Sequence, residues 1–165
     1  MPAISQQNKQ TVKTENISGR QYVTFSIKDE LYGIDVRRAR EVMNLPKITK
    51  VPDTMPFMKG VIDLRGKIIP LIDMRIKFKI DEKTYDQNTV IIIIDVKKVV
   101  CGIIVDSVSD VVNMPLNDVQ HTPHFASEVE KDSVFGIGKI GDKLVIVLDV
   151  DRLLSDEELL LIKAE

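Results

Sequence analysis

The spacing of apolar residues predicts β-strands along most of the chain. In the segment 22–27 every second residue from Val23 onward is apolar, which is the period of a strand with one buried face. A tight connection then leads to a returning strand over 31–36. The run 90–94 is apolar at all of its positions, which predicts a strand buried on both faces. We expect this strand where two units of the molecule meet.

An internal repeat organises the sequence. The segment GIDVRRAREVMNLP at 33–46 reappears as GIIVDSVSDVVNMP at 102–115, shifted by 69 positions without a gap and with six of fourteen residues identical. A second pair, 60–73 and 136–149, is shifted by 76 positions, and each member is an apolar run broken by a turn. The longer shift puts seven extra residues in the loop 116–135. The chain is therefore predicted to be a duplicated β unit.

A short helical turn is expected after the second strand of each unit. Val36, Ala39, Val42 and Met43 are spaced three, three and one apart, and the segment 105–112 repeats this spacing. Such spacing is typical of a helical stripe packed on a core.

The C-terminus carries a helix signal. Ser155 followed three residues later by Glu158 is a capping-box pattern. We expect Leu159, Leu160 and Ile162 of this helix to lie against the rest of the fold.

Together these patterns predict an all-β fold with a short C-terminal helix, in which two small antiparallel sheets each curl into a barrel and so leave no open edge. The first barrel is expected mainly within 20–86, the second mainly within 87–152, and the helix within 153–165. Residues 1–19 contain almost no apolar side chains and predict a flexible tail, so the folded domain is 20–165.

Composition narrows the functional classes. With 23 Lys and Arg against 25 Asp and Glu, the net charge of −2 gives no sign of nucleic-acid or anionic-membrane binding. No run of eighteen apolar residues predicts insertion into a membrane, and no apolar stretch near the N-terminus resembles a secretory signal. The single cysteine excludes an intramolecular disulfide, so a cytoplasmic location is expected.

The sequence offers no convincing catalytic, cofactor or metal site. Cys101 lies within an apolar strand, which favours an inert core thiol. His121 and His124 have Pro123 between them, so no regular helix aligns them as ligands, and we interpret them as solvated loop residues. The G-x-G-x-x-G at 136–141 leads into a strand where a dinucleotide site needs a helix. We therefore expect no enzymatic activity, no cofactor and no small-molecule substrate.

Signals for surface binding are stronger. Arg65 is predicted at a hairpin tip, where it is either an ordinary solvated turn residue or a contact residue. Glu41 sits among apolar neighbours, as the polar edge of a buried turn or as a binding residue. Two barrels side by side would also create a groove suited to a partner's helix or loop.

At this point the sequence resembles the CheW-type chemotaxis coupling proteins. The segment 59–75, KGVIDLRGKIIPLIDMR, is similar to the family's signature KGv-NLRG-iiPv-DLR. YGIDV at 32–36, with Glu41 after it, resembles the family's second strand and following turn, and 102–108 resembles the corresponding part of its second half. The resemblance runs from about Gln21 to the C-terminal helix.

The resemblance implies two five-stranded SH3-like barrels and a non-enzymatic adaptor. Such adaptors join chemoreceptors (methyl-accepting chemotaxis proteins) to the regulatory domain of a CheA-type histidine kinase, in cytoplasmic arrays at the inner face of the membrane. By motif, the receptor's signalling tip would meet Val36, Ala39 and Glu41 in the groove between the barrels, and Arg65 would be the arginine needed for coupling. Asp63 stands where the family usually has Asn. Its carboxylate lacks the amide's donors, so either a local hydrogen bond is remade or Asp63 pairs with a cation such as Arg65.

Two other functions stay open. The chain could serve a receptor–kinase pathway that does not control flagella. It could also be a barrel protein that binds single-stranded nucleic acid, although only 5% of its residues are aromatic and Trp is absent. Binding to nucleic acid would weaken steeply with salt, which separates this class from the others.

Overall fold

The computed structural model describes residues 20–115, 118–120 and 133–163. The predicted tail 1–19 and the histidines of the 121–132 segment lie outside the described residues. Within them, the chain forms ten strands: β1 (Arg20–Ile27), β2 (Glu30–Asp35), β3 (Ala39–Asn44), β4 (Met58–Leu64), β5 (Lys67–Asp73), β6 (Val90–Val96), β7 (Val99–Val105), β8 (Ser107–Met114), β9 (Val134–Ile140) and β10 (Lys143–Leu148). Short helices complete the described chain: η1 (Val36–Arg38), α2 (Met74–Lys77), η3 (Val150–Arg152) and α4 (Asp156–Lys163).

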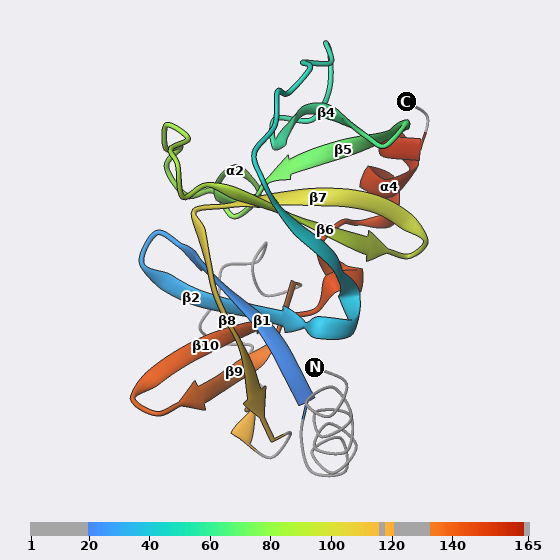
Figure 1. Ribbon diagram of the computed structural model, residues 1–165. Helices are drawn as coiled ribbons and strands as arrows, with labels where there is room; N and C mark the ends of the chain where they lie inside the picture. The colour runs from blue at the N-terminus through green and yellow to red at the C-terminus, as the bar shows by residue number, and fades with distance from the viewer. Residues whose placement is uncertain (1–19, 116–117, 121–132, 164–165) are drawn as a thin grey trace, which may run out of the picture.

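The strands form two five-stranded sheets, which make the lower and upper lobes of Figure 1. One sheet has the order β8-β1-β2-β10-β9 and is called the β1 barrel here. The other has the order β3-β6-β7-β5-β4 and is called the β6 barrel. Strand for strand, β1 to β5 correspond to β6 to β10, so the two orders are the same. The prediction of a duplicated unit and of an all-β fold with two five-stranded sheets is confirmed.

The predicted division of the chain between the barrels is wrong. Each barrel takes strands from both halves of the sequence, so a boundary between 20–86 and 87–152 divides neither sheet. The chain leaves the β1 barrel after β2 and enters the β6 barrel at β3, and it crosses back between β7 and β8. Parallel pairing of β2 with β10 and of β5 with β7 then joins strands of different halves. The duplicated units have exchanged strands reciprocally.

The predicted helical turns are largely replaced by strands. In the segment 36–43, helical geometry is confined to η1. In the equivalent later segment, residues 107–114 are strand β8 throughout. β3 pairs with β6, with a register shift between Ala39 and Glu41. That irregularity and the adjoining η1 turn explain the three-residue spacing that resembles a helix in the sequence. The valine-rich composition also favours strands.

Each barrel is closed by a single bridge. Thr49, beyond β3, exchanges backbone hydrogen bonds of 2.9 and 2.8 Å with Val61 of β4. At the equivalent place in the β1 barrel, Gln120 exchanges bonds of 2.9 and 2.7 Å with Ile137 of β9. These bridges join the two ends of each sheet, so the edge strands are paired.

The core has three parts, and β6 contributes to two of them. Ile91 and Ile93 face the inside of the β6 barrel, whereas Ile92 and Ile94 face the layer between the barrels. That central layer also holds Phe25 and many other buried residues from both sheets. A third cluster fills the β1 barrel. The prediction that the run 90–94 is buried on both faces where the units meet is confirmed.

An ion pair anchors each crossover between the barrels. Arg75 of α2 binds Asp106, between β7 and β8, with its Nη2 2.6 Å from Oδ2, and both side chains are mostly buried. Asp106 also accepts the backbone N–H of Lys28, in the β1–β2 turn, at 2.9 Å. At the other crossover, Arg38 of η1 binds Asp151 of η3 at 2.5 Å.

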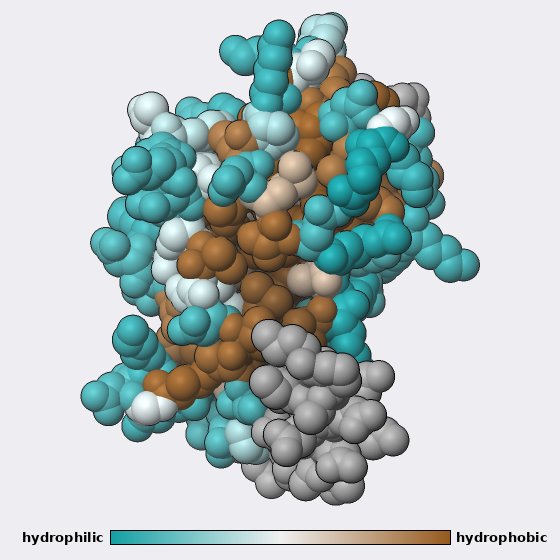
Figure 2. Space-filling model, viewed as in Figure 1, coloured by the Kyte–Doolittle hydropathy of each residue, from teal (hydrophilic) through white to brown (hydrophobic). Residues whose placement is uncertain are grey.

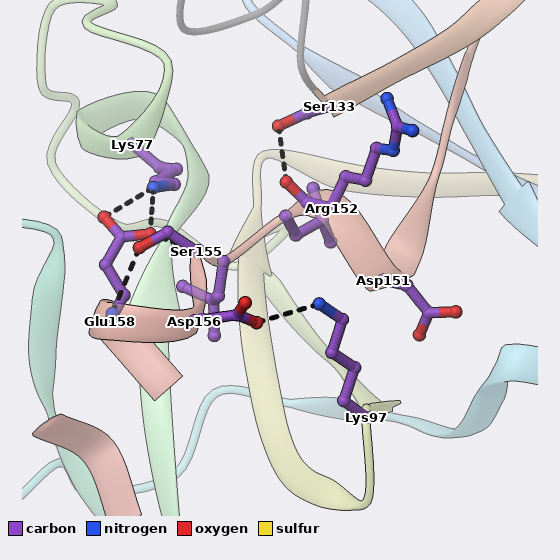
Figure 3. A pocket seen from close by; sticks show the side chains of 10 residues that line it. Lys77, Lys97, Ser133, Asp151, Arg152, Ser155, Asp156 and Glu158 are labelled. Atoms are coloured by element: carbon purple, nitrogen blue, oxygen red, sulfur yellow. Dashed lines mark hydrogen bonds and ion pairs between the residues drawn. The ribbon is translucent and has the colours of Figure 1, made fainter. Parts of the chain in front are cut away.

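The C-terminal helix is tied to the barrels by charged side chains (Figure 3). Ser155 and Glu158 form the predicted capping box, with bonds of 2.8 and 3.1 Å. Glu158 also accepts from Lys77 of α2 at 2.8 Å, and Asp156 pairs with Lys97 of the β6–β7 turn at 3.0 Å. Lys77, Lys97, Asp156 and Glu158 line one pocket between α4 and the barrels. Their charges neutralise one another, and the pocket serves to dock the helix.

The apolar face of α4 differs from the prediction at one position. Leu159 and Ile162 are buried against the barrels as expected. Leu160 is instead 66% exposed, because it lies on the opposite side of the helix.

Candidate functional site

Two of the four predicted site residues meet at one end of the β6 barrel. Glu41 lies on β3, and Arg65 lies at the tip of the β4–β5 hairpin with a left-handed φ of 50°. The Nη2 of Arg65 donates a hydrogen bond to Oε1 of Glu41. This hydrogen bond raises the pKa of Arg65. The two residues are 24 positions apart in the sequence. The sequence resemblance assigns them separately, Glu41 to the receptor groove and Arg65 to the hairpin needed for coupling.

Asp63 takes part in the hairpin turn and leaves Arg65 free to reach Glu41. Its Oδ1 accepts the backbone N–H of Gly66 at 2.9 Å. An asparagine oxygen could accept the same bond, so the carboxylate preserves the turn. The suggested pairing of Asp63 with Arg65 is not what the structure has.

A groove of about 280 Å³ surrounds this ion pair. Its lining combines charged side chains, among them Arg40 and Lys67, with the almost fully buried Ile69 and Ile93. The side chain of Arg65 is 72% exposed and that of Glu41 is 33% exposed. A guanidinium held in place yet still open to solvent can donate to a partner's carboxylate or backbone oxygen.

Val36 and Ala39 lie at the crossover between the barrels. Val36 begins η1 and Ala39 begins β3, and both are half-buried against the central core. They therefore belong to the seam between the lobes, whereas Glu41 turns toward the barrel end. The structure thus brings Glu41 to Arg65, and β3 with the preceding η1 turn links this pair to Ala39 and Val36.

Three exposed valines on β3 and β8 were missed by the sequence interpretation. Val42 is 42% exposed, Val108 38% and Val111 55%, although the helical-turn model buried them. Figure 2 shows hydrophobic surface down the middle of the face on which β3 and β8 run in Figure 1. In the repeat, Val111 is the counterpart of Val42 and Val108 that of Ala39, but the repeat does not tell which of these side chains the barrels leave exposed.

The groups considered for chemistry are structural wherever the structure describes them. Cys101 is fully buried, and burial raises the pKa of its thiol to about 12, so it is protonated at neutral pH. The segment 136–141 is strand β9 and the turn after it. Among the described residues, no group of three or more His, Cys, Asp or Glu side chains could hold a metal ion.

In the described part of the chain, none of the helices has the length and hydrophobicity needed to cross a membrane.

Comparison with known proteins identifies the family. The model of the CheW-like domain matches residues 21–158. The chain belongs to the CheW-like family. It is 37% identical over 144 residues to the chemotaxis protein CheW of Klebsiella aerogenes, with 87% of each chain covered. It is 30% identical over 143 residues to CheW of Treponema pallidum, with 84% of each chain covered.

A solved structure supports the same assignment. The crystal structure of the scaffolding protein TtCheW from Thermoanaerobacter tengcongensis superposes with a TM-score of 0.78 at 34% identity, covering 85% of this chain and 95% of that one. CheW-family proteins are scaffolds and not enzymes, which agrees with the expectation drawn from the sequence.

Proposed function

We propose that this CheW-family chemotaxis scaffold couples chemoreceptors to a CheA-type histidine kinase by binding both at once through different faces. The observation that carries the proposal is the hydrophobic surface between two barrels that are rigidly joined at their crossovers. A surface of this kind suits the apolar side of a receptor's helical signalling tip. Recruitment to receptor arrays at the inner face of the membrane would follow from this contact.

On the receptor side, the contact is built from Val36, Ala39 and Glu41, extended by the exposed valines. Val36 and Ala39 line the seam, and Val42 and Val108 offer apolar area on either strand that borders it. Desolvation of these side chains would supply most of the affinity. Glu41 would fix orientation through its charge.

Arg65, which is hydrogen-bonded to Glu41, is the residue proposed for coupling receptor binding to kinase control. Its guanidinium is anchored by Glu41 and exposed at a barrel end, so it is preorganised for contact with a partner. Loss of Arg65 should therefore impair signalling by the ternary complex more than it affects the fold.

A pull-down with the receptor signalling tip and the kinase regulatory domain tests the proposal. Val42→Asp should weaken receptor binding by tenfold or more, because it buries a charge in an apolar contact, while kinase binding is retained. Leu160→Asp is the matched control, since it places the same charge at an exposed leucine of α4.

The kinase arm uses Arg65→Ala, which should lower kinase control in a reconstituted array. Unchanged kinase control by this variant, or equal receptor binding by Val42→Asp and Leu160→Asp, would contradict the assignment.

A further inference from the structure

A cavity of about 420 Å³ lies at the end of the β1 barrel where β1 begins and where β2 and β10 end. Its lining combines arginines and aspartates with a tyrosine and with apolar side chains of β10 and η3. These lining residues differ from the four assigned to coupling, so the cavity is separate from the proposed receptor and kinase contacts.

Tyr22 of β1 brings a buried hydroxyl to this cavity. The residue is 3% exposed, and it belongs to the cluster that fills the β1 barrel. The charged groups that act on its hydroxyl are Arg20, Asp35 and Arg37, which line the same cavity. Among the described residues, this hydroxyl has no hydrogen-bond partner. Buried tyrosine hydroxyls usually have one, because burial removes their bonds to water.

The Tyr22 hydroxyl is a donor at neutral pH. Burial raises the pKa of Tyr22 above its usual value, while the nearby charge of Arg20 acts in the opposite direction with a smaller effect. The phenol therefore keeps its proton and can donate it in a hydrogen bond to an anion.

Arg20 places a cation beside that hydroxyl. It lies two residues before Tyr22 on β1, so the two side chains point to the same face of the strand. Its Nη1 is 3.6 Å from Oδ2 of Asp35, which is beyond hydrogen-bond distance, and its side chain is 46% exposed. Asp35 is engaged instead by Arg37, whose Nε and Nη2 donate at 3.1 and 2.7 Å. Within the described chain, the guanidinium donors of Arg20 are thus available to another acceptor.

The charges around the cavity leave one cation without an aspartate of its own. Three neighbouring guanidinium groups have one, at 2.7, 2.5 and 3.7 Å: Arg37 with Asp35, Arg38 with Asp151, and Arg152 with Asp149. Arg20 is the fourth, and the aspartate beside it is the one that Arg37 already binds. A ligand with a single negative charge would balance Arg20. A doubly charged phosphate would in addition be repelled by the carboxylates of Asp35 and Asp149, which also line the cavity.

The remaining wall of the cavity is apolar. Val147, Leu148 and Val150 line it, and each is at most 3% exposed. The volume of about 420 Å³ is within the range of small-ligand sites, which are mostly apolar with a few polar groups that fix orientation. An anion on a small aliphatic body matches this division between polar and apolar walls.

We propose that this cavity binds a carboxylate carried on a small apolar body, with the Tyr22 hydroxyl and the Arg20 guanidinium donating to the carboxylate and Val147 and Val150 packing on the body. Such a carboxylate has two sources, a free aliphatic acid or the C-terminal residue of a partner chain, and both present the same chemistry. The site goes beyond the proposed coupling function and stands or falls independently of it.

The test is a titration of N-acetyl-leucine into the full chain, followed by amide chemical shifts. We expect saturable binding in the millimolar range, with shift changes centred on β1, β10 and η3. N-acetyl-leucinamide has the same body without the charge and should bind at least tenfold more weakly. 4-Methylpentanoate keeps the carboxylate and the aliphatic group but has no peptide bond. Equal affinity for it would identify a free acid as the source, and weaker binding a chain end; either result supports the carboxylate site.

Variants of the two donors test their roles. Tyr22→Phe and Arg20→Gln should each weaken the binding of N-acetyl-leucine about tenfold, because a hydrogen bond to a charged acceptor is lost. Tyr22→Phe should melt at the wild-type temperature or above it, because no hydrogen bond within the described chain is removed. Arg40→Gln is the matched control, since Arg40 is 52% exposed and 3.4 Å from Asp95 but lies outside the cavity. Binding to this variant should be unchanged.

Several results would overturn the proposal. Equal affinity for N-acetyl-leucine and its amide, or the absence of saturation at tens of millimolar, would show that the cavity holds solvent only. Unchanged binding by Tyr22→Phe, or a marked loss of stability in that variant, would show that the hydroxyl serves the fold. Tighter binding of inorganic phosphate than of N-acetyl-leucine would contradict the single charge, and shift changes centred on the groove around Arg65 would place the carboxylate elsewhere.

Discussion

At each of the two crossovers an ion pair joins the barrels, but the places of the cation and the anion are exchanged. At one, the cation Arg75 lies in the helical turn after β5 and the anion Asp106 lies in the crossover. At the other, the anion Asp151 lies in the equivalent turn after β10 and the cation Arg38 lies in the crossover. The fold thus requires an ion pair at this place and accepts either polarity. Arg75 and Asp151 occupy equivalent positions of the repeat with opposite charges, whereas their partners Asp106 and Arg38 are one position out of register with each other.

The crossovers also differ in burial, which should set their energies. The side chains of Arg75 and Asp106 are 14% and 16% exposed, against 32% and 45% for Arg38 and Asp151. Buried pairs cost more to break because the remaining charge is left without compensation, whereas exposed pairs are screened by water. The predictions below test this and other differences between the barrels.

The largest effect is expected where the β6 barrel closes. A Cβ on Gly60 would lie 2.2 Å from the carbonyl oxygen of Thr49, and its φ of 146° disfavours a side chain. Gly60→Ala should therefore lower the free energy of unfolding by about 4 kcal/mol, measured by urea denaturation. Gly136→Ala, where the Cβ would lie 2.5 Å from the oxygen of Gln120, should cost somewhat less.

Gly66→Ala is the control for backbone strain alone, because a Cβ there meets no atom within 4 Å although its φ is 87°. It should cost about 1 kcal/mol. If all three variants were equally stable, close approach at the bridges would not be what holds the barrels shut.

The buried crossover pair should show the next largest effect. Asp106→Asn should cost about 3 kcal/mol at pH 7, and Asp151→Asn about 1 kcal/mol or less. Burial alone would raise the pKa of Asp106, but hydrogen bonds from Arg75 and Lys28 outweigh it, so the pKa is lowered from its usual 3.8. The stabilisation is therefore present above pH 3.8 and is lost as the pH falls through the folded-state pKa.

Thermal melts of Asp106→Asn and wild type over a pH series measure this linkage. The gap between them should be widest near neutral pH and should narrow below pH 3.8. A gap that stayed constant into acid would show that the charge of Asp106 is not what stabilises the crossover.

The hydrogen bond from Tyr85 to Asp73 in the β6 barrel should contribute a smaller amount to stability. Tyr85→Phe removes the phenol that donates to Asp73, which is 4% exposed, and should cost about 1.5 kcal/mol. Asp149→Asn, at the equivalent but more exposed carboxylate, should cost less than about 1 kcal/mol. Chemical denaturation of both variants compares the two carboxylates, and equal costs would contradict a stabilising role for the hydrogen bond from Tyr85 to Asp73.

The smallest effect on stability is expected at the hairpin tips. Arg65 and Glu41 form an exposed pair, so Arg65→Ala should leave the free energy of unfolding close to that of the wild type. The equivalent hairpin of the β1 barrel turns through Gly141 and Asp142 and has no arginine there. A large loss of stability in Arg65→Ala would indicate a structural role for this arginine in place of one in binding.

Local patterns in the sequence predicted the elements that depend on neighbouring residues. The capping box at Ser155, the tight turns and the double-faced burial of 90–94 all follow from spacing within a few positions. The spacing after Val36 misled because a 3₁₀ turn followed by a bulged strand has nearly the same apolar period as a helix. Pairing with β6 decided that segment as strand.

The candidate site was predicted only in part for the same reason. Arg65 and Glu41 were each recognisable from the sequence, but their hydrogen bond depends on β3 and the β4–β5 hairpin belonging to one sheet. The exposure of Val42, Val108 and Val111 also depends on which faces the barrels cover.

By itself, the sequence determined a duplicated β protein, because strand period, turn chemistry and repeat spacing are written in consecutive residues. The resemblance of the segment 59–75 to a known signature added the CheW-like family. Only the tertiary structure decided that the duplicated units exchange strands and that an ion pair anchors each crossover. These features arise from contacts between residues far apart in the chain. A linear pattern carries little information about such contacts, since many pairings satisfy the same local periodicity.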